Sequence, residues 1–432
     1  MSTERQIAIH VPVLARVEGE GALELRARGD RIEDVHLRIF EPPRFFEKLL
    51  EGRDHAEVPD MVARICGICP VAYQMSAVQA IERAFGIEPG DWVRAMRRVM
   101  YCGEWIESHA LHIHLLAAPD FLGFGSAIEM AQRHPAEVRR GLALQGVGNE
   151  LIRLLGGRSV HPVGVCVGGF HRAPSLQEVD RMVSRLRATL PDAEALVAWT
   201  AELPLPRSEQ TFSAVALRHG KEYPMNEGQI VSSGGLDIDV ADYERYFEES
   251  QVAHSTALFS LLEGKPYLVG PLARLQLNLD RLPPPVARSL ETCGVRFPTR
   301  NMYHSIVARA AEILLAVHEA IRLLSGYSRP AMSRIPVRPH AGVGYGATEA
   351  PRGLLWHRYE FDTDGHVRAA RIVPPTSQNQ ARIEEDLRQS LEEYGLAHSD
   401  DELRRRCETV IRNYDPCISC ATHFLQLHVS RA

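Results

Sequence analysis

Apolar and polar residues alternate in two short stretches near the start of the chain. Residues 22–28 and 35–39 both follow this period of two, and Gly29-Asp30 lies between them. Such alternation is typical of strands with one buried face, and a Gly-Asp pair favours a tight turn. The pattern predicts a small antiparallel sheet over residues 7–39.

From Cys66 to about residue 200, apolar residues instead recur at helical spacing. One such stripe consists of Val71, Met75, Val78 and Ile81. We therefore expect a helical core in the middle of the chain and an α+β fold that is mostly α.

Residues 355–361 and 366–373 form a second pair of alternating stretches, and Asp362-Thr363-Asp364-Gly365 lies between them. An Asp-Gly pair in this setting is a strong short-range hairpin signal. A hairpin centred on residue 364 places Arg352 opposite Thr376, so we expect these two residues to be neighbours.

No repeat, flexible linker or block of charge divides the sequence, although its length would permit about three domains. We expect residues 1–423 to form a single interlocked unit. Its expected parts are an N-terminal sheet region (1–60), a mainly helical core (61–330), a hairpin region (331–380) and C-terminal helices with a cysteine motif (381–423).

The composition is that of a folded globular protein, with 432 residues, 45% hydrophobic and 24% charged, and a net charge of −6. Because no basic stripe suited to phosphates is present, nucleic acid is not an expected partner. No apolar run approaches the roughly 20 residues that span a bilayer, and the N-terminus does not resemble a signal peptide. The 8 cysteines are too few for a disulfide scaffold, so we expect a cytoplasmic protein with reduced thiols.

Two Cys-x-x-Cys pairs lie near opposite ends of the chain, in Arg64-Ile65-Cys66-Gly67-Ile68-Cys69-Pro70 and in Asp415-Pro416-Cys417-Ile418-Ser419-Cys420-Ala421-Thr422-His423. Each pair adjoins a proline suited to the first turn of a helix. We therefore expect both pairs at helix N-termini, where the helix dipole favours a thiolate. Four thiolates in two pairs indicate a metal site.

Structural zinc is the simplest interpretation of two such pairs. Zinc ribbons, however, close with about 15 to 20 residues between the pairs, whereas residues 70 to 416 separate these. A redox Cys-x-x-Cys needs only one pair and a nearby βαβ pattern, which is missing at both positions. Soft thiolates also suit nickel, iron or copper(I), and a cofactor buried at the centre of the fold fits the spacing better.

The motifs Arg-x-Cys-Gly-x-Cys-Pro and Asp-Pro-Cys-x-x-Cys-x-x-His resemble those of the large, catalytic subunit of nickel-iron hydrogenases, and the likeness runs across essentially the whole chain. The resemblance implies that Cys66, Cys69, Cys417 and Cys420 hold nickel. It implies that Cys69 and Cys420 also bridge to an iron carrying carbon monoxide and cyanide. It further implies a central helical bundle with small peripheral antiparallel sheets. The related subunit of respiratory complex I lacks the four thiols. Their presence in this sequence therefore favours a working hydrogenase.

The resemblance also assigns residues around the metals. Glu18, in an Arg-x-Glu-Gly motif, would relay protons from the terminal nickel ligand Cys417. Arg352, which follows Pro351, would lie over the metals, and the Pro-Thr segment containing Thr376 would hydrogen-bond a cyanide. Taken alone, Glu18 and Arg352 would be interpreted as exposed surface charges.

A magnesium or similar divalent ion is implied as well, with Glu47, the backbone carbonyl of Ile372 and His423 as ligands. His112 and Asp120 would lie around the metal ligands, with Asp120 near Arg352. His109 and His114 flank His112, but histidines on an amphipathic helix are usually packed side chains.

Gly342-Val343-Gly344-Tyr345-Gly346-Ala347 fits a loose dinucleotide-binding pattern. We discount it because no strand precedes it and no helix is expected after it.

The remaining cysteines show no spacing typical of an iron-sulfur cluster, so electrons must leave through a partner; they are Cys102, Cys166, Cys293 and Cys407. The resemblance supplies an iron-sulfur small subunit and, in soluble relatives, flavin-containing diaphorase subunits that reduce NADP or NAD. The alternatives are a hydrogen sensor with a kinase partner and, less favoured, a zinc-stapled structural subunit.

Residues 424–432 extend beyond His423. In the family, a maturation endopeptidase removes such an extension once nickel-insertion proteins have loaded the site, so we expect this segment to be cleaved.

Overall fold

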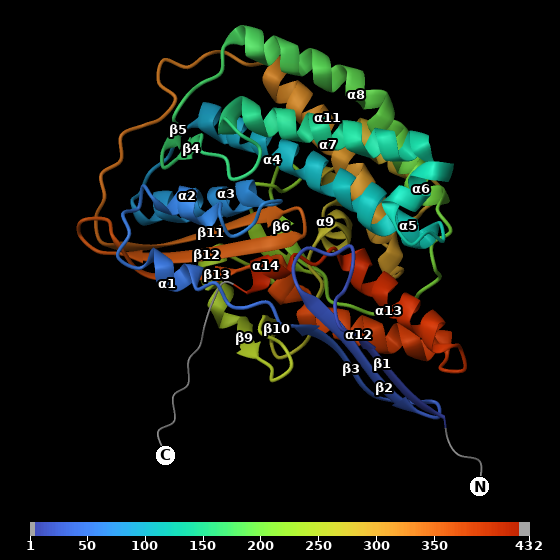
Figure 1. Ribbon diagram of the computed structural model, residues 1–432. Helices are drawn as coiled ribbons and strands as arrows, with labels where there is room; N and C mark the ends of the chain where they lie inside the picture. Colours follow the sequence, from blue (N-terminus) through green and yellow to red (C-terminus); the bar gives the residue numbers. More distant parts are fainter. Residues whose placement is uncertain (1–4, 423–432) are drawn as a thin grey trace, which may run out of the picture.

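The computed structural model describes residues 5–422, and its N-terminal part is the small sheet that the sequence predicts (Figure 1). The strands are β1 (Gln6–Val11), β2 (Gly21–Arg28) and β3 (Arg31–Ile39), paired antiparallel in that order. Gly29 lies in the turn between β2 and β3 with a φ of 61°, which glycine adopts without strain. The predicted sheet is confirmed.

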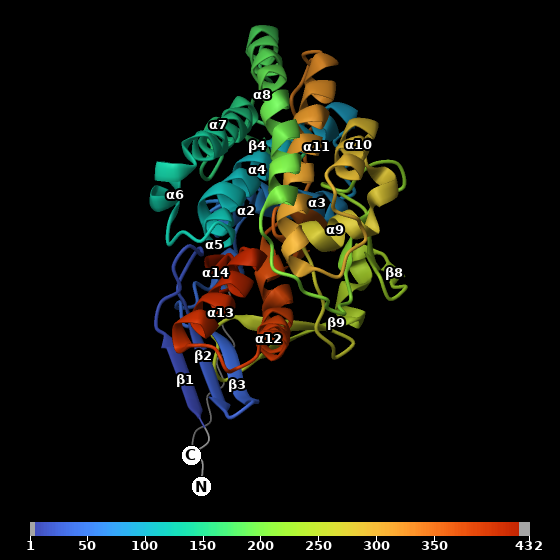
Figure 2. The same ribbon diagram turned by 90° about the vertical axis from the view of Figure 1, so that its right-hand side faces the viewer.

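Helices packed side by side form the bulk of the molecule (Figures 1 and 2). They are α2 (Val58–Val62), α3 (Pro70–Ala84), α4 (Asp91–Leu111), α5 (Ala118–Phe121), α6 (Ala127–Arg133), α7 (Pro135–Gly156), α8 (Leu176–Glu202), α9 (Pro271–Leu277), α10 (Pro284–Thr292) and α11 (Ser305–Ser325). The long helices α4, α7, α8 and α11 bury apolar stripes against one another, which confirms the helical core. A π-helical turn, His112–Ala117, joins α4 to α5, and such turns are frequent at functional sites.

Residues 203–270 depart from the expected mainly helical core. They form short strands and a 3₁₀ helix: β6 (Val215–Arg218), β7 (Gln229–Ser232), β8 (Asp237–Ile238), the 3₁₀ helix Val240–Arg245, β9 (Phe247–Gln251) and β10 (Leu258–Leu262). Strands β6, β7 and β8 form one sheet, and β9 pairs with β10. The expectation was wrong here because periodicity cannot assign such short apolar runs to strand or helix. Further short elements are β4 (Val165–Cys166), β5 (Gly169–Phe170) and the 3₁₀ helices Leu279–Arg281 and Met302–His304.

The hairpin region contains the two predicted strands and one that was not predicted. The predicted pair is β12 (Gly353–Phe361) and β13 (Val367–Val373), and β11 (Gly342–Ala350) pairs with the other edge of β12. A bulge between Glu360 and Phe361 shifts the pairing by one residue, so that Trp356 lies opposite Val373. The hairpin is confirmed, with a register one residue away from the one that places Arg352 opposite Thr376.

The glycines of β11 lie against the backbone of α3. A Cβ atom on Gly342, Gly344 or Gly346 would approach a backbone oxygen of α3 closer than 3.0 Å, and for Gly344 and Gly346 those oxygens belong to Ala80 and Ser76. Because the glycines alternate along the strand, all three present the same face to the helix. The glycine-rich run is therefore a surface for helix packing, and the dinucleotide interpretation was rightly discounted.

The last elements carry the second cysteine motif back to the centre of the fold. They are α12 (Pro375–Tyr394), α13 (Asp400–Tyr414) and α14 (Ile418–Ala421), and the short helix α1 (Phe46–Leu50) packs on β13 nearby. Helix α12 packs against β3, β10 and α13, and α14 lies between the sheets and the helical core (Figure 1). Over residues 5–422, no helix has the length and apolar composition needed to cross a lipid bilayer.

Substitution of Gly344 by alanine tests the close packing of β11 on α3. The added Cβ collides with the Ala80 carbonyl oxygen, so we expect a lower thermal midpoint and a loss of about 1–3 kcal/mol in the free energy of unfolding. The matched control is Gly146→Ala in α7, where the Cβ meets open space and helix propensity improves. Equal midpoints for the two variants, measured by calorimetry, would contradict the packing described here.

Candidate metal centre

The four cysteines of the two pairs come together in one buried cluster. Cys66 lies just before α3 and Cys69 caps its N-terminus, whereas Cys417 caps α14 and Cys420 lies within it. The sulfur of Cys417 is 3.4 Å from that of Cys66 and 2.9 Å from that of Cys420. The sulfurs of Cys69 and Cys420 are 3.5 Å apart, and all four lie within 4.8 Å of one another. The two ends of the chain therefore meet at one site.

Arg44 ties the two cysteine segments together, although the sequence analysis did not single it out. Its Nη2 atom donates hydrogen bonds to the carbonyl oxygens of Ile65, at 2.7 Å, and of Ser419. Its backbone N–H donates to the carbonyl oxygen of Thr422 at 2.7 Å. One arginine thus binds the backbone next to both Cys-x-x-Cys pairs.

The charge state of the thiols is uneven. Burial raises the pKa of Cys417 and of Cys420, which disfavours their thiolates. Burial also opposes ionisation of Cys66, but contacts with the Cys417 sulfur and the charge of Arg352 bring its pKa well below the usual value. Backbone N–H groups of Ile68 and Cys69 donate to the Cys66 sulfur at 3.3 and 3.2 Å. A bound cation would allow all four sulfurs to act as thiolate ligands.

The two prolines beside the cysteine pairs occupy different positions. Pro70 is the first residue of α3, as predicted. Pro416 instead precedes the N-cap residue Cys417 and lies outside the first turn, although both cysteine pairs lie at helix N-termini as predicted. The cause is Asp415, which ends α13 in the left-handed conformation with a φ of 57° and leaves Pro416 in the link between the helices.

Glu104 occupies the N-terminus of α3, where the thiolates were expected to gain from the helix dipole. Its carboxylate accepts hydrogen bonds from the backbone N–H groups of Val71, at 2.6 Å, and Ala72, at 3.0 Å. Burial raises the pKa of Glu104 well above its usual value. The first-turn N–H groups of Val71 and Ala72 are therefore used by a carboxyl group from α4, which no local sequence signal indicates.

Glu18 contacts the cluster directly. Its Oε2 atom is 3.1 Å from the sulfur of Cys417 and accepts a hydrogen bond from the Ser419 N–H at 3.1 Å. The backbone carbonyl of Glu18 accepts from the N–H of Ile418 at 3.0 Å. The Arg-x-Glu-Gly segment is thus bound to α14 through both backbone and side chain.

Arg352 is buried, with 3% of its surface exposed, and is held by Asp415. Its Nε donates to the Asp415 carbonyl oxygen at 2.8 Å and its Nη2 to the carboxylate at 3.1 Å. Its Nη1 is buried without a hydrogen-bond partner within residues 5–422. Although burial opposes its charge, Asp415 and the cysteines raise the pKa of Arg352, which keeps a fixed positive charge close to the cluster.

Within residues 5–422, Asp120 forms its ion pairs with Arg16 and Arg412 rather than with Arg352. It binds Arg16, and it accepts a hydrogen bond from Nε of Arg412 at 2.6 Å. The carboxylate beside Arg352 is that of Asp415, three residues along the chain from Arg412. Two separate ion-pair groups therefore lie where the sequence suggested one.

Thr376 and Arg352 bind the same short segment rather than each other. The hydroxyl oxygen of Thr376 accepts a hydrogen bond from the N–H of Cys417 at 3.0 Å. Arg352 binds Asp415, two residues earlier. The two ends of the hairpin thus both hydrogen-bond to residues 415–417.

The three histidines are buried and neutral. His112 Nε2 lies 2.8 Å from the Arg412 carbonyl oxygen, and burial lowers its pKa to about 3. His114 lies 3.0 Å from the Ala110 carbonyl oxygen, and burial lowers its pKa to about 4. His109 has a carboxylate partner, Glu312, at 3.0 Å, and burial brings its pKa to about 4. Within residues 5–422 none of them belongs to a group of potential metal ligands.

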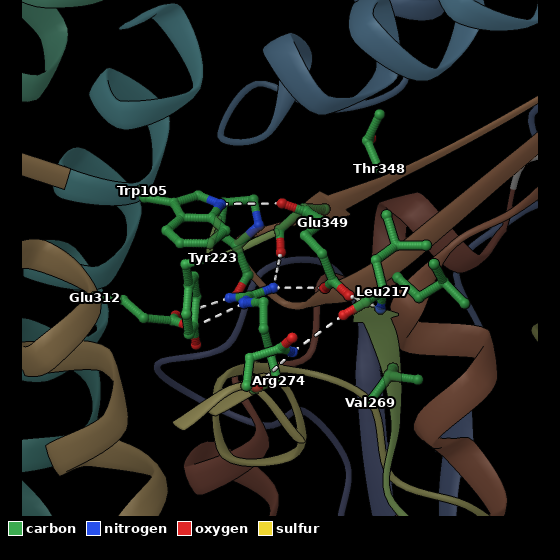
Figure 3. A network of polar contacts seen from close by, with 12 residues as sticks. Trp105, Leu217, Tyr223, Val269, Arg274, Glu312, Thr348 and Glu349 are labelled. Atoms are coloured by element: carbon green, nitrogen blue, oxygen red, sulfur yellow. Dashed lines mark hydrogen bonds and ion pairs between the residues drawn. The ribbon is translucent and has the colours of Figure 1, made fainter. Parts of the chain in front are cut away.

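A network of buried charges holds the residues before Arg352 (Figure 3). Its centre is Arg274 of α9, which binds Glu312 through two hydrogen bonds of 2.7 Å and Glu349 through one of 2.7 Å. The same guanidinium donates to the carbonyl oxygens of Ala350, at 2.9 Å, and Pro351, at 3.5 Å. Arg274 therefore fixes the backbone on the N-terminal side of Arg352.

The network also reaches the other side of Arg352. Glu312 contacts His109, and Arg309 lies 3.5 Å from the opposite ring nitrogen of that histidine. Arg309 Nη1 is 3.6 Å from the carboxylate of Asp415, the partner of Arg352. A continuous chain of buried polar contacts thus joins Arg274 to the residue that holds the Arg352 guanidinium.

Glu47 and Ile372 are neighbours, as the expected hard-ion site requires. The Oε1 atom of Glu47 accepts a hydrogen bond from the backbone N–H of Ile372 at 2.7 Å. His423, the third expected ligand, lies outside the described residues.

Comparison with known proteins decides the family. The family model described as nickel-dependent hydrogenase matches residues 44–144 and 261–423. The alpha subunit of sulfhydrogenase 2 from Pyrococcus furiosus is 34% identical, over 97% of this chain and 100% of the relative. This chain belongs to the nickel-dependent hydrogenase family.

Solved structures of the family agree with the fold. An NAD+-reducing [NiFe]-hydrogenase in the H2-reduced state superposes with a TM-score of 0.87 at 26% identity, over 96% of this chain and 99% of that one. A [NiFeSe] hydrogenase from Desulfovibrio vulgaris Hildenborough has a TM-score of 0.79 at 23% identity, over 98% of this chain and 100% of that one. The hydrogenase large-subunit fold, a helical core with small antiparallel sheets, is confirmed.

The residues present fit the metals of this family. Four buried sulfurs are soft donors suited to nickel and iron, and they already lie at separations that ligands around one centre require. The unpartnered Nη1 of Arg352 adds a buried donor beside them. The family supports nickel and iron at its active site, and the four-cysteine cluster offers donors suited to both.

Arg274→Lys tests whether the buried network positions Arg352. A lysine keeps the charge but cannot bind Glu312 with two hydrogen bonds and also reach Glu349 and the Ala350 carbonyl. We expect hydrogen turnover per nickel to fall at least about tenfold, equivalent to ~1.4 kcal/mol in the activation barrier.

The matched control for this variant is Arg97→Lys. Arg97 is equally buried and binds Glu82 through two hydrogen bonds of 2.7 and 2.6 Å, but it does not contact residues 350–352. The control should lose stability while keeping turnover per nickel. Equal turnover in both variants would show that the network only stabilises the fold.

Proposed function

We propose that this chain is the subunit that reversibly splits H2 into protons and electrons within a heteromeric nickel-iron hydrogenase. The observation that carries the proposal is the 3.1 Å contact between Glu18 Oε2 and the sulfur of Cys417, inside a buried four-cysteine cluster. When bound, the nickel-iron centre supplies the Lewis-acid and redox chemistry that breaks the H–H bond.

Cys417 and Glu18 form the proton-transfer pair. The thiolate sulfur of Cys417 accepts the proton, and the Glu18 carboxylate, at hydrogen-bond distance, takes it away from the site. The Ser419 N–H bound to the same carboxylate oxygen holds it in place. Arg352, fixed by Asp415, stabilises negative charge that develops beside it during the reaction.

The ligand assignment follows the family pattern. All four cysteines would hold nickel, and Cys69 and Cys420 would also hold an iron whose other ligands are carbon monoxide and cyanide. Thr376, which already binds the Cys417 backbone, would hydrogen-bond a cyanide. A magnesium or similar ion would use three ligands: Glu47, the Ile372 carbonyl oxygen and His423.

Electrons leave through partner subunits in this proposal. The other four cysteines of the chain join no group of metal ligands within residues 5–422, so an iron-sulfur small subunit is needed. A diaphorase-type subunit with flavin would pass the electrons to NADP or NAD. The support is a relative from Cupriavidus necator, the beta subunit of the NAD-reducing hydrogenase HoxS, 28% identical over 95% of this chain and 94% of the relative. We propose a cytoplasmic location on the same grounds.

The segment 424–432 is proposed to be removed by a maturation endopeptidase after nickel-insertion proteins have loaded the site. It lies outside the described residues, so the proposal rests on the family pattern alone. Mass spectrometry of active enzyme should find a chain that ends at His423.

Metal analysis of the purified, matured complex tests the proposed function. We expect nickel and iron rather than zinc, and Cys417→Ala should lose nickel because one of four sulfur ligands is gone. Cys407→Ala is the matched control, since Cys407 is equally buried but lies outside the cluster. Zinc in place of nickel would support a structural subunit instead.

Glu18→Gln tests the proton relay. The amide oxygen still accepts the Ser419 N–H, but the side chain can no longer take up a proton. We expect H2-dependent dye reduction by the complex to fall by about 10²-fold or more, with nickel content unchanged. The control is Glu20→Gln, an exposed neighbour. Full activity in Glu18→Gln would refute this relay while leaving the metal site intact.

A further inference from the structure

A second group of potential metal ligands lies outside the cysteine cluster. It consists of His36 on β3, His254 in the loop between β9 and β10, and Glu384 on α12. Their ligand atoms all lie within 4.8 Å of one another. Three segments that are far apart in the sequence therefore bring two imidazoles and a carboxylate to one point.

The distances in this group suit a small divalent ion. The Oε1 atom of Glu384 is 2.8 Å from His254 Nε2 and 3.5 Å from His36 Nδ1. A tetrahedral ion with ligand distances of about 2.0–2.2 Å holds neighbouring ligand atoms about 3.3–3.6 Å apart. The two rings are stacked with centroids 4.0 Å apart and planes at 28°, so they would have to move apart and tilt to admit the ion.

The hydrogen bonding of the group leaves a ligand position open. His36 Nδ1 is buried and, within residues 5–422, forms no hydrogen bond beyond its 3.5 Å approach to Glu384. The other nitrogen of that ring faces the carboxylate of Asp34 at 3.9 Å, a distance too long for a hydrogen bond. Glu384 accepts a hydrogen bond from the Leu37 N–H at 3.1 Å, which fixes its carboxylate in the group.

In two other groups of potential metal ligands, the carboxylates are already used by other contacts. In the group of His219, Glu222 and Glu227, both carboxylates already bind Arg94. In the hairpin turn, Asp362 accepts backbone N–H groups of the turn itself. Glu384, by contrast, forms no ion pair with an arginine or lysine within residues 5–422.

We propose that His36, His254 and Glu384 bind a zinc ion that clamps the N-terminal sheet and the β9–β10 loop onto α12. Two imidazoles and a carboxylate are common zinc ligands, and a water from the adjacent surface hollow, lined by Arg38, Phe40 and residues 251–256, completes the coordination. Burial raises the pKa of Glu384 to about 7, and a bound cation favours its ionised form.

The clamp bears on the metal centre because the first turn of α12 contacts the second cysteine pair. This helix begins at Pro375, so its first turn includes Thr376, the residue bound to the Cys417 backbone. The zinc would fix the far side of the same helix against the N-terminal sheet. The inference does not depend on the proposed hydrogenase activity.

Zinc binding by the matured, nickel-loaded complex tests the proposal. After incubation with zinc and dialysis, elemental analysis should find one zinc per chain beyond any zinc bound by cysteine. X-ray absorption at the zinc edge should show nitrogen and oxygen ligands at about 2.0–2.1 Å, whereas a cysteine site would show sulfur at about 2.3 Å. Zinc should also raise the thermal midpoint.

Three variants make the result specific. His254→Gln and Glu384→Gln should each lose the nitrogen- and oxygen-bound zinc and its thermal effect. His219→Gln, in the group whose carboxylates bind Arg94, should keep both. Midpoints measured without zinc identify a variant that simply fails to fold, and the other variant then carries the test. No extra zinc in the parent complex, or equal zinc in all variants, overturns the proposal.

Discussion

The burial of four sulfur atoms within 4.8 Å of one another is the constraint on which the rest of the structure depends. Four thiolates at such separations repel strongly in a low-dielectric interior, so the cluster is compatible with full ionisation only around a cation. The fold must also deliver the sulfurs from both ends of the chain. It does so by backbone contacts, through Glu18 to α14 and through Arg44 to Ile65 and Ser419, which hold both cysteine segments at the site.

Rigidity around this centre comes from two different sources. Helix α3, which begins right after Cys69, lies so close to β11 that only glycine fits at the contact. Arg352 is held by charges instead, because Arg274 binds the backbone before it and Asp415 binds its guanidinium. Close packing thus fixes the start of α3 beside Cys69, and a buried ionic network fixes the positive charge of Arg352. Both are forms of preorganisation, which lets a site stabilise developing charge without rearranging.

Much of this could be predicted from local sequence, and the exceptions share a cause. The alternation of residues 22–39 and the Asp-Gly turn at residue 364 identify sheets because the signals lie within a few residues. The four cysteines were found because their spacing is itself the signal. Asp415 as the partner of Arg352, by contrast, is set by tertiary packing between residues 63 positions apart. The contacts of Arg44 and Glu104 could not be predicted for the same reason, because neither residue lies in a recognisable local motif.

The electrostatics of the network bear on which groups can govern proton transfer. Burial lowers the pKa of His109 to about 4 and of His112 to about 3, so both are neutral between pH 5 and 8. The carboxylate of Glu312 stays ionised over the same range. Burial alone would raise the pKa of Glu312, but the adjacent positive charge of Arg274 lowers it to about 2. The charges of His109, His112 and Glu312 are therefore constant in this pH range. These three groups are therefore unsuited to exchange protons in this range, whereas Glu18 places a carboxyl group at hydrogen-bond distance from a cluster sulfur.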